Sequence, residues 1–248
     1  MAVGKTEDDI TYKYGRENLR DNPVAKKGIQ EYYDRFYAKS DFNYYKENIT
    51  NRFLKTILKK GHVQKGATIL DVGCATGFYT RQFGILGYKA VGVDISSVGI
   101  FKGHIKYPSA VLLVGDASVL PLKNSSFDVL FMYGCSLTNT DDLDAIRSFI
   151  TYLTGFISDD GVLIFIGGSN FSGTTSYPSE WISHSYNDIK KFIDVSEACF
   201  EGPYITFLKP LSFVGAISLN KLFSTLCRIF PTRKSRTIIY YIRKKARK

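Results

Sequence analysis

Five short apolar segments follow one another along the middle of the chain, and their spacing constrains the fold more than any other feature. They cover residues 68–72, 90–93, 111–114, 129–133 and 162–166. Short and almost continuously apolar segments are typical of strands that are buried on both faces of a parallel sheet. Three aspartates, Asp71, Asp94 and Asp116, lie at or just beyond the ends of the first three segments.

Helical patterns separate these strands. Residues 78–86 carry apolar side chains at helical spacing, and Gly87 follows as a C-cap. Residues 141–157 fit a helix that acidic residues begin. Strand, helix and strand in succession predict parallel pairing through right-handed crossovers. The expected fold class is α/β, with a Rossmann-like, doubly wound sheet that has helices on both faces.

A length of 248 residues fits one large α/β domain, so we expect a single domain over residues 1–248. Residues 61–170 would form its core, between a helical cap over 1–60 and a later segment over 171–248. No apolar run reaches the roughly 18 to 20 residues of a membrane span. The first 22 residues mix charges and lack the apolar stretch of a secretory signal. A cytoplasmic location is therefore expected.

The segments that flank the core have their own signals. The cap pattern, over residues 27–60, is helical and rich in tyrosine: Tyr32, Tyr33, Tyr37, Tyr44 and Tyr45. Aromatic packing and a lid over a bound ligand are the two roles open to these rings. Beyond the core we expect a helix over 186–194, a strand over 204–208, a helix over 211–230 and a final strand over 237–242.

The net charge of +10 is concentrated near the C-terminus. Residues 202–248 hold 11 Lys or Arg and no Asp or Glu, whereas the preceding part holds 22 basic and 23 acidic side chains. This distribution favours one localised anionic contact over general coating of nucleic acid. The contact would be an anionic membrane surface or a phosphate-bearing acceptor, such as a lipid-linked or nucleotide-linked sugar. Simple solubilisation of the terminus is the alternative.

The four cysteines form no pair or cluster with metal-ligand spacing. Neither zinc nor a disulfide framework is therefore expected. Cys74 and Cys135 fall at strand ends and are interpreted as buried free thiols.

The turn after the first strand, residues 73–77, has the sequence GCATG. Gly73 and Gly77 allow a close backbone approach, and Ala75 is the smallest replacement for a middle glycine. Such a turn alone also occurs as a tight connection in any doubly wound protein. Asp94 strengthens the signal, because a carboxylate at the end of the next strand can accept both hydroxyl protons of an adenosine ribose.

Asp94 and the glycines would still permit NAD. Two features separate the possible cofactors: the spacing is G-x-A-x-G rather than G-x-G-x-x-G, and Asp71 would repel a pyrophosphate. A cofactor with an ammonium and a sulfonium, S-adenosylmethionine, would instead be attracted. Asp116 is placed to bind an adenine amino group, and Ala117 leaves room for the ring.

Taken in order, four motifs resemble the class I S-adenosylmethionine-dependent methyltransferases, in particular the small-molecule branch called the type 11 methyltransferase domain. They are ILDVGCATG at 69–77, VGVDIS at 91–96, GDASVLPLKNSSFDVLF at 115–131 and GVLIFIG at 161–167. The resemblance implies a seven-stranded sheet of order 3-2-1-4-5-7-6, in which residues 237–242 form the antiparallel strand. It also implies that S-adenosylmethionine is the cofactor.

The resemblance carries over to individual positions. It places Asp71, Gly73 and Gly77 around the methionine part, Asp94 at the ribose, and Asp116 with Ala117 at the adenine. The neighbouring Cys74, Ala75 and Ile95 complete the expected cofactor-binding set. The sequence GCSLTN at 134–139 lacks the histidine that many relatives have there, so no general base is carried over.

Methyl transfer is an in-line displacement, so alignment in a dry site can supply most of the acceleration. A base is needed only if the acceptor must lose a proton early. His184 is the candidate base, and a surface-loop histidine is the alternative. Tyr133 could face the acceptor, and a core tyrosine is the alternative. Asn139 could also face the acceptor, with helix capping as the alternative.

The predicted function is methyl transfer to a small molecule. An RNA or protein methyltransferase would also suit a basic tail, but no RNA-binding module and no Asn-Pro-Pro-Tyr-like tetrad is found. A noncatalytic nucleoside-binding scaffold is the second alternative.

Overall fold

The computed structural model describes residues 23–39, 47–170, 182, 184–194, 198–205 and 236–244. Its helices are α2 (Pro23–Lys39), α3 (Glu47–Lys60), α4 (Phe78–Ile85), α5 (Ser97–Lys106), α6 (Leu143–Thr154) and α7 (Tyr186–Ile193), with a 3₁₀ turn, η1, at Ser136–Thr138. Its strands are β1 (Thr68–Val72), β2 (Lys89–Asp94), β3 (Val111–Val114), β4 (Phe127–Tyr133), β5 (Ile157–Asn170), β6 (His184–Ser185), β7 (Ala198–Ile205) and β8 (Arg236–Lys244).

The strands form one mixed sheet of order β3-β2-β1-β4-β5-β8-β7, and the short β6 pairs with the end of β5. The first five strands are parallel, whereas β8 runs antiparallel to both β5 and β7. This path follows the expected order 3-2-1-4-5-7-6. The fold class predicted from the alternating strand and helix patterns is therefore confirmed.

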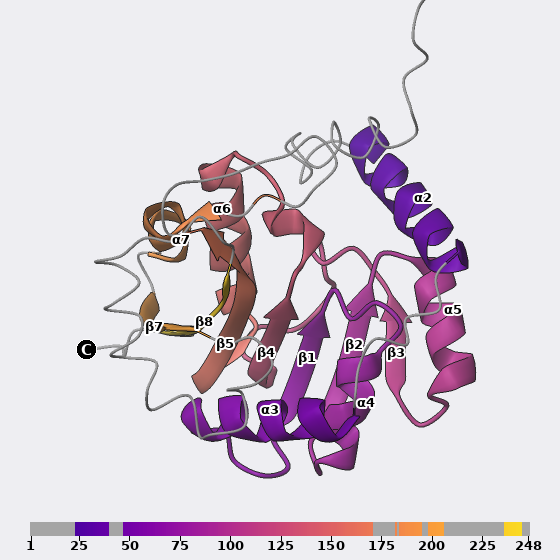
Figure 1. Cartoon of the computed structure of the whole chain (residues 1–248), viewed down its shortest axis with the longest axis horizontal. Coiled ribbons are helices and arrows are strands. Elements are labelled where there is room, and N and C mark those ends of the chain that lie inside the picture. Colours follow the sequence, from indigo (N-terminus) through magenta and orange to yellow (C-terminus); the bar gives the residue numbers. More distant parts are fainter. Residues whose placement is uncertain are drawn as a thin grey trace, which may run out of the picture.

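Two layers of helices enclose the sheet (Figure 1). On one face, α3 and α4 bury Leu54, Ile57 and Phe83 against β1, β4, β5 and β8, and α5 packs beside α4 near the β3 edge. On the other face, α6 and α7 bury Phe149 and Phe192 against the same sheet. Burial on both faces explains the apolar character of the central strands.

The edge strand β3 departs from the expected burial on both faces. Val111, Leu113 and Val114 are each about half exposed, while Leu112 is buried between the sheet and α5. The cause is position, because β3 is the last strand of the sheet on this side.

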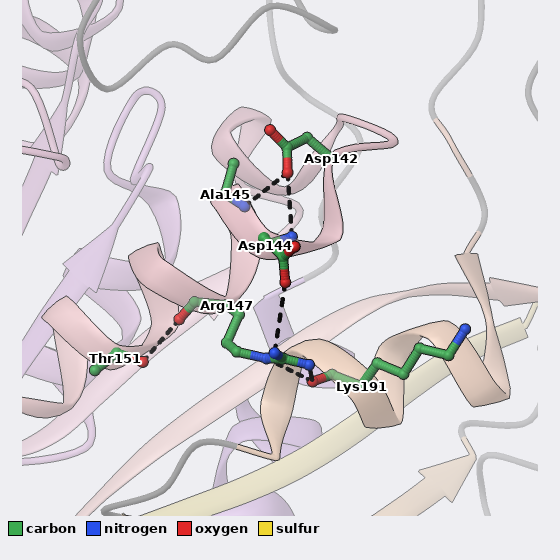
Figure 2. A network of polar contacts seen from close by, with 6 residues as sticks. All are labelled: Asp142, Asp144, Ala145, Arg147, Thr151 and Lys191. Carbon is green, nitrogen blue, oxygen red and sulfur yellow. Dashed lines mark hydrogen bonds and ion pairs between the residues drawn. The ribbon is translucent and has the colours of Figure 1, made fainter.

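The boundary between α6 and β5 was also predicted wrongly. The helix expected over 141–157 begins at Leu143, with Asp142 accepting hydrogen bonds from the backbone amides of Asp144 and Ala145, and it ends at Thr154. Ile157 already belongs to β5, because it pairs with Phe127 of β4. Figure 2 shows the Asp142 cap.

Helix α6 is joined to α7 by one side chain. The Arg147 guanidinium donates two hydrogen bonds to the carbonyl oxygen of Lys191, at 3.0 and 2.7 Å, and lies 3.4 Å from the carboxylate of Asp144 (Figure 2). The contact joins α7 to α6, and both helices pack against the same sheet.

Some expectations fall partly or wholly outside the described residues. The helix expected over 211–230 and the basic residues 245–248 lie outside them. The strand expected over 204–208 corresponds to β7, which begins earlier, at Ala198. In the described part of the chain, no helix has the length and apolar character needed to cross a membrane.

Candidate functional site

The carboxyl ends of β2, β1 and β4 meet at one edge of the sheet, where the strand order changes direction. Ligands of open parallel sheets bind at such a point. The turn after β1 starts there: the backbone amides of Gly73 and Cys74 both donate to the carbonyl oxygen of Val93, at 2.9 and 3.0 Å. The turn is thereby bound to β2.

Three residues of this turn have left-handed backbone conformations: Gly73 (φ 73°), Ala75 (φ 56°) and Gly77 (φ 76°). A Cβ atom at Gly77 would lie 2.4 Å from Cδ2 of Leu112, so only glycine fits there. Ala75 holds a conformation that costs an L-residue roughly 1–2 kcal/mol. The glycines predicted from the sequence are therefore required by the backbone of this turn.

Asp94 ends β2 and reaches back to the turn. Its Oδ2 accepts from the Ala75 amide at 2.8 Å, and its Oδ1 accepts from the Ser96 amide at 2.9 Å. The side chain is 8% exposed, and burial is the main cause of its raised pKa, against which these amides act. The Ile95 amide also acts on this carboxylate. A carboxylate has about four lone-pair sites, so the side chain keeps acceptor capacity for a ribose hydroxyl.

Asp71 lies inside the fold, 2% exposed. Its Oδ2 accepts a hydrogen bond of 2.6 Å from the Thr80 hydroxyl on α4. Burial, followed by the nearby charge of Asp94, raises the pKa of Asp71 to about 7, although the Thr80 hydrogen bond lowers it. A cationic ligand group beside this side chain would favour its ionised form.

The structure places the third acid, Asp116, just after β3. Its Oδ1 accepts from the backbone amide and the hydroxyl of Ser118, at 2.9 and 2.7 Å, which fixes the carboxylate in the loop. Ala117 packs against the core beneath this loop. Ile95, on the β2 side, packs with Ile29 and other apolar side chains. Asp116 and Ala117, the candidate adenine contacts, thus lie near the carboxyl ends of the parallel strands.

Helix α2 brings Tyr33, one of the tyrosines for which the sequence left aromatic packing and a lid as alternatives, close to the candidate site. Tyr33, Ile95 and Leu137 all pack against Ile29. The Tyr33 hydroxyl is hydrogen-bonded to the Ser136 side chain, and burial raises the pKa of Tyr33 well above its usual value. Cys135 and Asp94 lie close enough to contribute to that shift. Tyr33 therefore bridges the loops that follow β2 and β4, on either side of β1.

Tyr133 is the last residue of β4, at the carboxyl ends of the parallel strands. It is 37% exposed, its ring packs 5.6 Å from that of Tyr79 between centroids, and its hydroxyl is hydrogen-bonded to the side chain of Thr237 on β8. The interpretation as a core tyrosine is therefore wrong: the residue stands at the rim of the sheet.

His184 is buried, at 4% exposure, so the alternative of a surface-loop histidine is wrong. Its Nε2 lies 3.0 Å from the carbonyl oxygen of Thr138, and its ring packs edge-on against Phe192. Burial is the main cause of its lowered pKa, although the Thr138 carbonyl and the charges of Asp188 and Asp141 act in the opposite direction.

Asn139 does not cap helix α6, which was the alternative to a role at the acceptor. Its Oδ1 accepts a hydrogen bond of 2.7 Å from the backbone amide of Ile182. Together with the contact between His184 and Thr138, this bond ties the chain around β6 to the loop after β4. Asp142, not Asn139, caps α6.

These residues fit S-adenosylmethionine. Two buried carboxylates are available for cationic and hydroxyl groups, and a turn without bulky side chains lies between them. Cys74 and Cys135 are free buried thiols, and burial raises the pKa of each. Both thiols therefore stay neutral beside the two carboxylates.

Comparison with known proteins agrees with the geometry. A family model described as a methyltransferase domain matches residues 69–154. Malonyl-[acyl-carrier protein] O-methyltransferase of Yersinia pestis is 25% identical over 75 residues, which is 30% of this chain and 28% of that protein. The chain spans less than a third of the curated relatives it matches.

Solved structures share the fold. A TehB-like S-adenosylmethionine-dependent methyltransferase from Corynebacterium glutamicum aligns with a TM-score of 0.54 at 17% identity, covering 90% of this chain and all of the other. The [4+2]-cyclase SpnF aligns with a TM-score of 0.62 at 12% identity, covering 88% and 96%. Residues 69–154 thus match a methyltransferase domain, and the chain has the fold of the class I S-adenosylmethionine-dependent methyltransferases.

Proposed function

We propose that this protein transfers the methyl group of S-adenosylmethionine to a small anionic acceptor. The observation that carries the proposal is the arrangement of Asp71, Asp94 and Asp116 around the turn after β1. Asp94 would accept the ribose hydroxyls, Asp71 would face the cationic methionine end, and Asp116 would bind the adenine amino group. Cys74, Gly73, Ala75 and Gly77 would form the floor between them.

When bound, the cofactor supplies an electrophilic methyl group on a positively charged sulfur. The work left to the chain is to align the acceptor with that group and to keep water out. Tyr33 on α2 reaches the loop after β4, and Tyr133 at the end of β4 packs against Tyr79 of α4. The acceptor would lie against the rings of Tyr133 and Tyr79.

The environment of the candidate base favours an acceptor that is already negatively charged. Among the described residues, His184 is the histidine at the carboxyl edge, and it is buried with Nε2 directed at a backbone carbonyl. A sugar hydroxyl must lose a proton as it reacts, whereas a carboxylate has none to lose. A carboxylate acceptor therefore suits this site better than the hydroxyl of a lipid-linked or nucleotide-linked sugar.

Two further considerations support an anionic acceptor. The basic C-terminal residues would attract one, or would dock the protein at an anionic membrane surface where such an acceptor is found. The Yersinia pestis relative is named for O-methylation of a malonyl group on acyl carrier protein. We extend that acceptor chemistry, a carboxylate, to this chain as part of the proposal.

The test is methyl transfer from labelled S-adenosylmethionine into cell extract, followed by separation into lipid, small-molecule, RNA and protein fractions. Label that enters small molecules or lipids and is released by mild alkali, as a methyl ester is, supports the proposal. Alkali-stable label in RNA or protein would replace it by the alternative methyltransferase classes. Cofactor binding without label in any fraction would favour a noncatalytic scaffold.

A pair of matched variants distinguishes methyl transfer by this protein from methyl transfer by other enzymes in the extract. Asp94→Ala removes the proposed ribose contact, while Asp128→Ala removes an exposed aspartate that binds Thr68 at the opposite end of β4. Incorporation should disappear with the first variant and persist with the second.

A further inference from the structure

Helix α2 lies close to Asp94, the carboxylate proposed to bind the ribose, because Tyr33 and Asp34 are both near it. It stands above α5, beyond the end of the sheet to which β1 and β2 point (Figure 1). Tyr33 reaches from α2 to Ser136 after β4, and both Tyr33 and Ile95, which follows β2, pack against Ile29 of α2. With this helix in place, Asp94 is 8% exposed.

Two polar contacts hold α2 on α5, and each lies at a helix end. The Asp34 carboxylate accepts from the Val98 amide at 3.1 Å and from the hydroxyls of Ser96 and Ser97 at 2.6 and 3.3 Å. At the other end, the Lys102 ammonium donates to the carbonyl oxygens of Tyr37 and Ala38, at 2.6 and 3.1 Å.

Both contacts place a charge where a helix dipole favours it. Asp34 is negative at the N-terminus of α5, and Lys102 is positive at the C-terminus of α2. Between them the helices approach closely, since a Cβ atom at Gly99 would lie 2.9 Å from the ring of Tyr37. The docked position of α2 is therefore specific.

Ser96 connects this docking to the ribose site. Its hydroxyl donates to Asp34 and accepts from the Gly99 amide, while its backbone amide donates to Asp94. One residue thus caps α5, binds α2 and orients the ribose carboxylate. The Ser96 hydroxyl partner therefore comes from α2, while the Ser96 amide holds Asp94.

We propose that α2 is a lid that must leave α5 before adenosine can reach Asp94, and that Asp34 positions Asp94 through Ser96 when the lid closes. This inference rests on the proposed function, because it concerns the same cofactor site. Docking of α2 completes the ribose site and Tyr33 then covers it, so cofactor binding and lid closure stabilise each other.

The test measures association and dissociation of S-adenosylhomocysteine on the immobilised full chain by surface plasmon resonance. Asp34→Ala should raise both the association and the dissociation rate constant. The dissociation rate constant should rise most, by about tenfold, which corresponds to about 1.4 kcal/mol. Asp34→Asn, which keeps an oxygen acceptor for Ser96, should restore part of the slow dissociation. Lys102→Ala should raise both rate constants together, because Lys102 does not bind Ser96.

The matched control is Glu31→Ala, which removes the same charge from the same helix at a position paired only loosely with Lys27, at 4.0 Å. Its rates should equal those of the unaltered chain. Asp34→Ala rates within twofold of the Glu31→Ala rates would overturn the lid.

Hydrogen exchange on the unaltered chain gives a second readout if Asp34→Ala does not fold. S-adenosylhomocysteine should slow exchange of the α2 amides at least tenfold and leave those of α6 unchanged. Binding without slower exchange of the α2 amides would contradict the lid proposal but not the proposed function. No binding at all would remove the proposed function, and the lid with it.

Discussion

The Oδ2 atom of Asp71 and the hydroxyl of Thr80 lie 2.6 Å apart in the buried layer between β1 and α4. This hydrogen bond partly offsets the burial that raises the pKa of Asp71 to about 7. Near neutral pH the side chain is therefore divided between its charged and neutral forms. The negative charge of Asp71 destabilises the ligand-free fold, because it is buried, and favours the binding of a cation.

Asp71→Asn tests that opposition. The amide keeps an oxygen acceptor for Thr80 and removes the buried charge, so the ligand-free variant should be more stable at pH 8 by about 1–3 kcal/mol. Its affinity for S-adenosylmethionine should fall about tenfold or more, because the cationic end loses its partner. Chemical denaturation and calorimetry measure the two effects. Loss of both stability and affinity would show that the charge is stabilising, against this prediction.

The pH dependence of stability has a definite sign. The pKa of Asp71 is raised on folding, so its contribution to stability is fully present below the unfolded value of 3.8 and is lost as the pH rises through about 7. The difference in unfolding free energy between Asp71→Asn and the unaltered chain should therefore grow between about pH 4 and pH 7. Parallel urea titrations at several pH values would reveal it. A constant difference would place the pKa of Asp71 near its ordinary value.

Gly77→Ala should damage the turn through two separate effects. The new methyl group would meet Leu112, which is buried, and the positive φ would be strained, for a combined cost of about 2–4 kcal/mol. Gly66→Ala is the control, because Gly66 has a φ of 79° with no heavy atom within 4 Å of its added Cβ. That variant should lose only about 1 kcal/mol. Equal losses in the two variants would mean that packing against Leu112 has no role.

Tyr133→Phe separates the acceptor side from the cofactor side. The ring would still pack on Tyr79, while the hydrogen bond to Thr237 would be lost. Affinity for S-adenosylhomocysteine should stay within about twofold, and label incorporation should fall about tenfold, as expected for an interaction made at the acceptor. An equal fall in both quantities would move Tyr133 to the cofactor side.

The sequence predicted the part of the site that a continuous stretch of chain builds. Gly73, Ala75 and Gly77 belong to one turn, and Asp94 follows the next strand at a spacing that parallel pairing makes meaningful. The left-handed φ values and the hydrogen bond from the Ala75 amide to Asp94 agree with that interpretation. A turn with positive φ values restricts the residue types at its positions, so the sequence indicates it directly.

The contacts made by α2 could not be predicted in the same way. Tyr33 and Asp34 act on residues about 60 to 100 positions away, and their own helix shows only a dense run of tyrosines. Burial of His184 likewise depends on Phe192 and on the loop after β4. Such roles come from tertiary packing, for which a single sequence has no periodic signal.

Strand boundaries failed for a related reason. β5 was expected over five residues and extends over 14, because β4, β6 and β8 each provide backbone partners along its length. Apolar patterning marks only the part of a strand that is buried on both faces.

The most direct measurement of the central claim is calorimetric titration of the full chain with S-adenosylmethionine, S-adenosylhomocysteine and NAD, repeated with Asp94→Ala. Both sulfur ligands should bind the unaltered chain, NAD should not, and Asp94→Ala should bind none of them while remaining folded by circular dichroism. Binding of NAD with neither sulfur ligand, or unchanged binding by Asp94→Ala, would contradict the account.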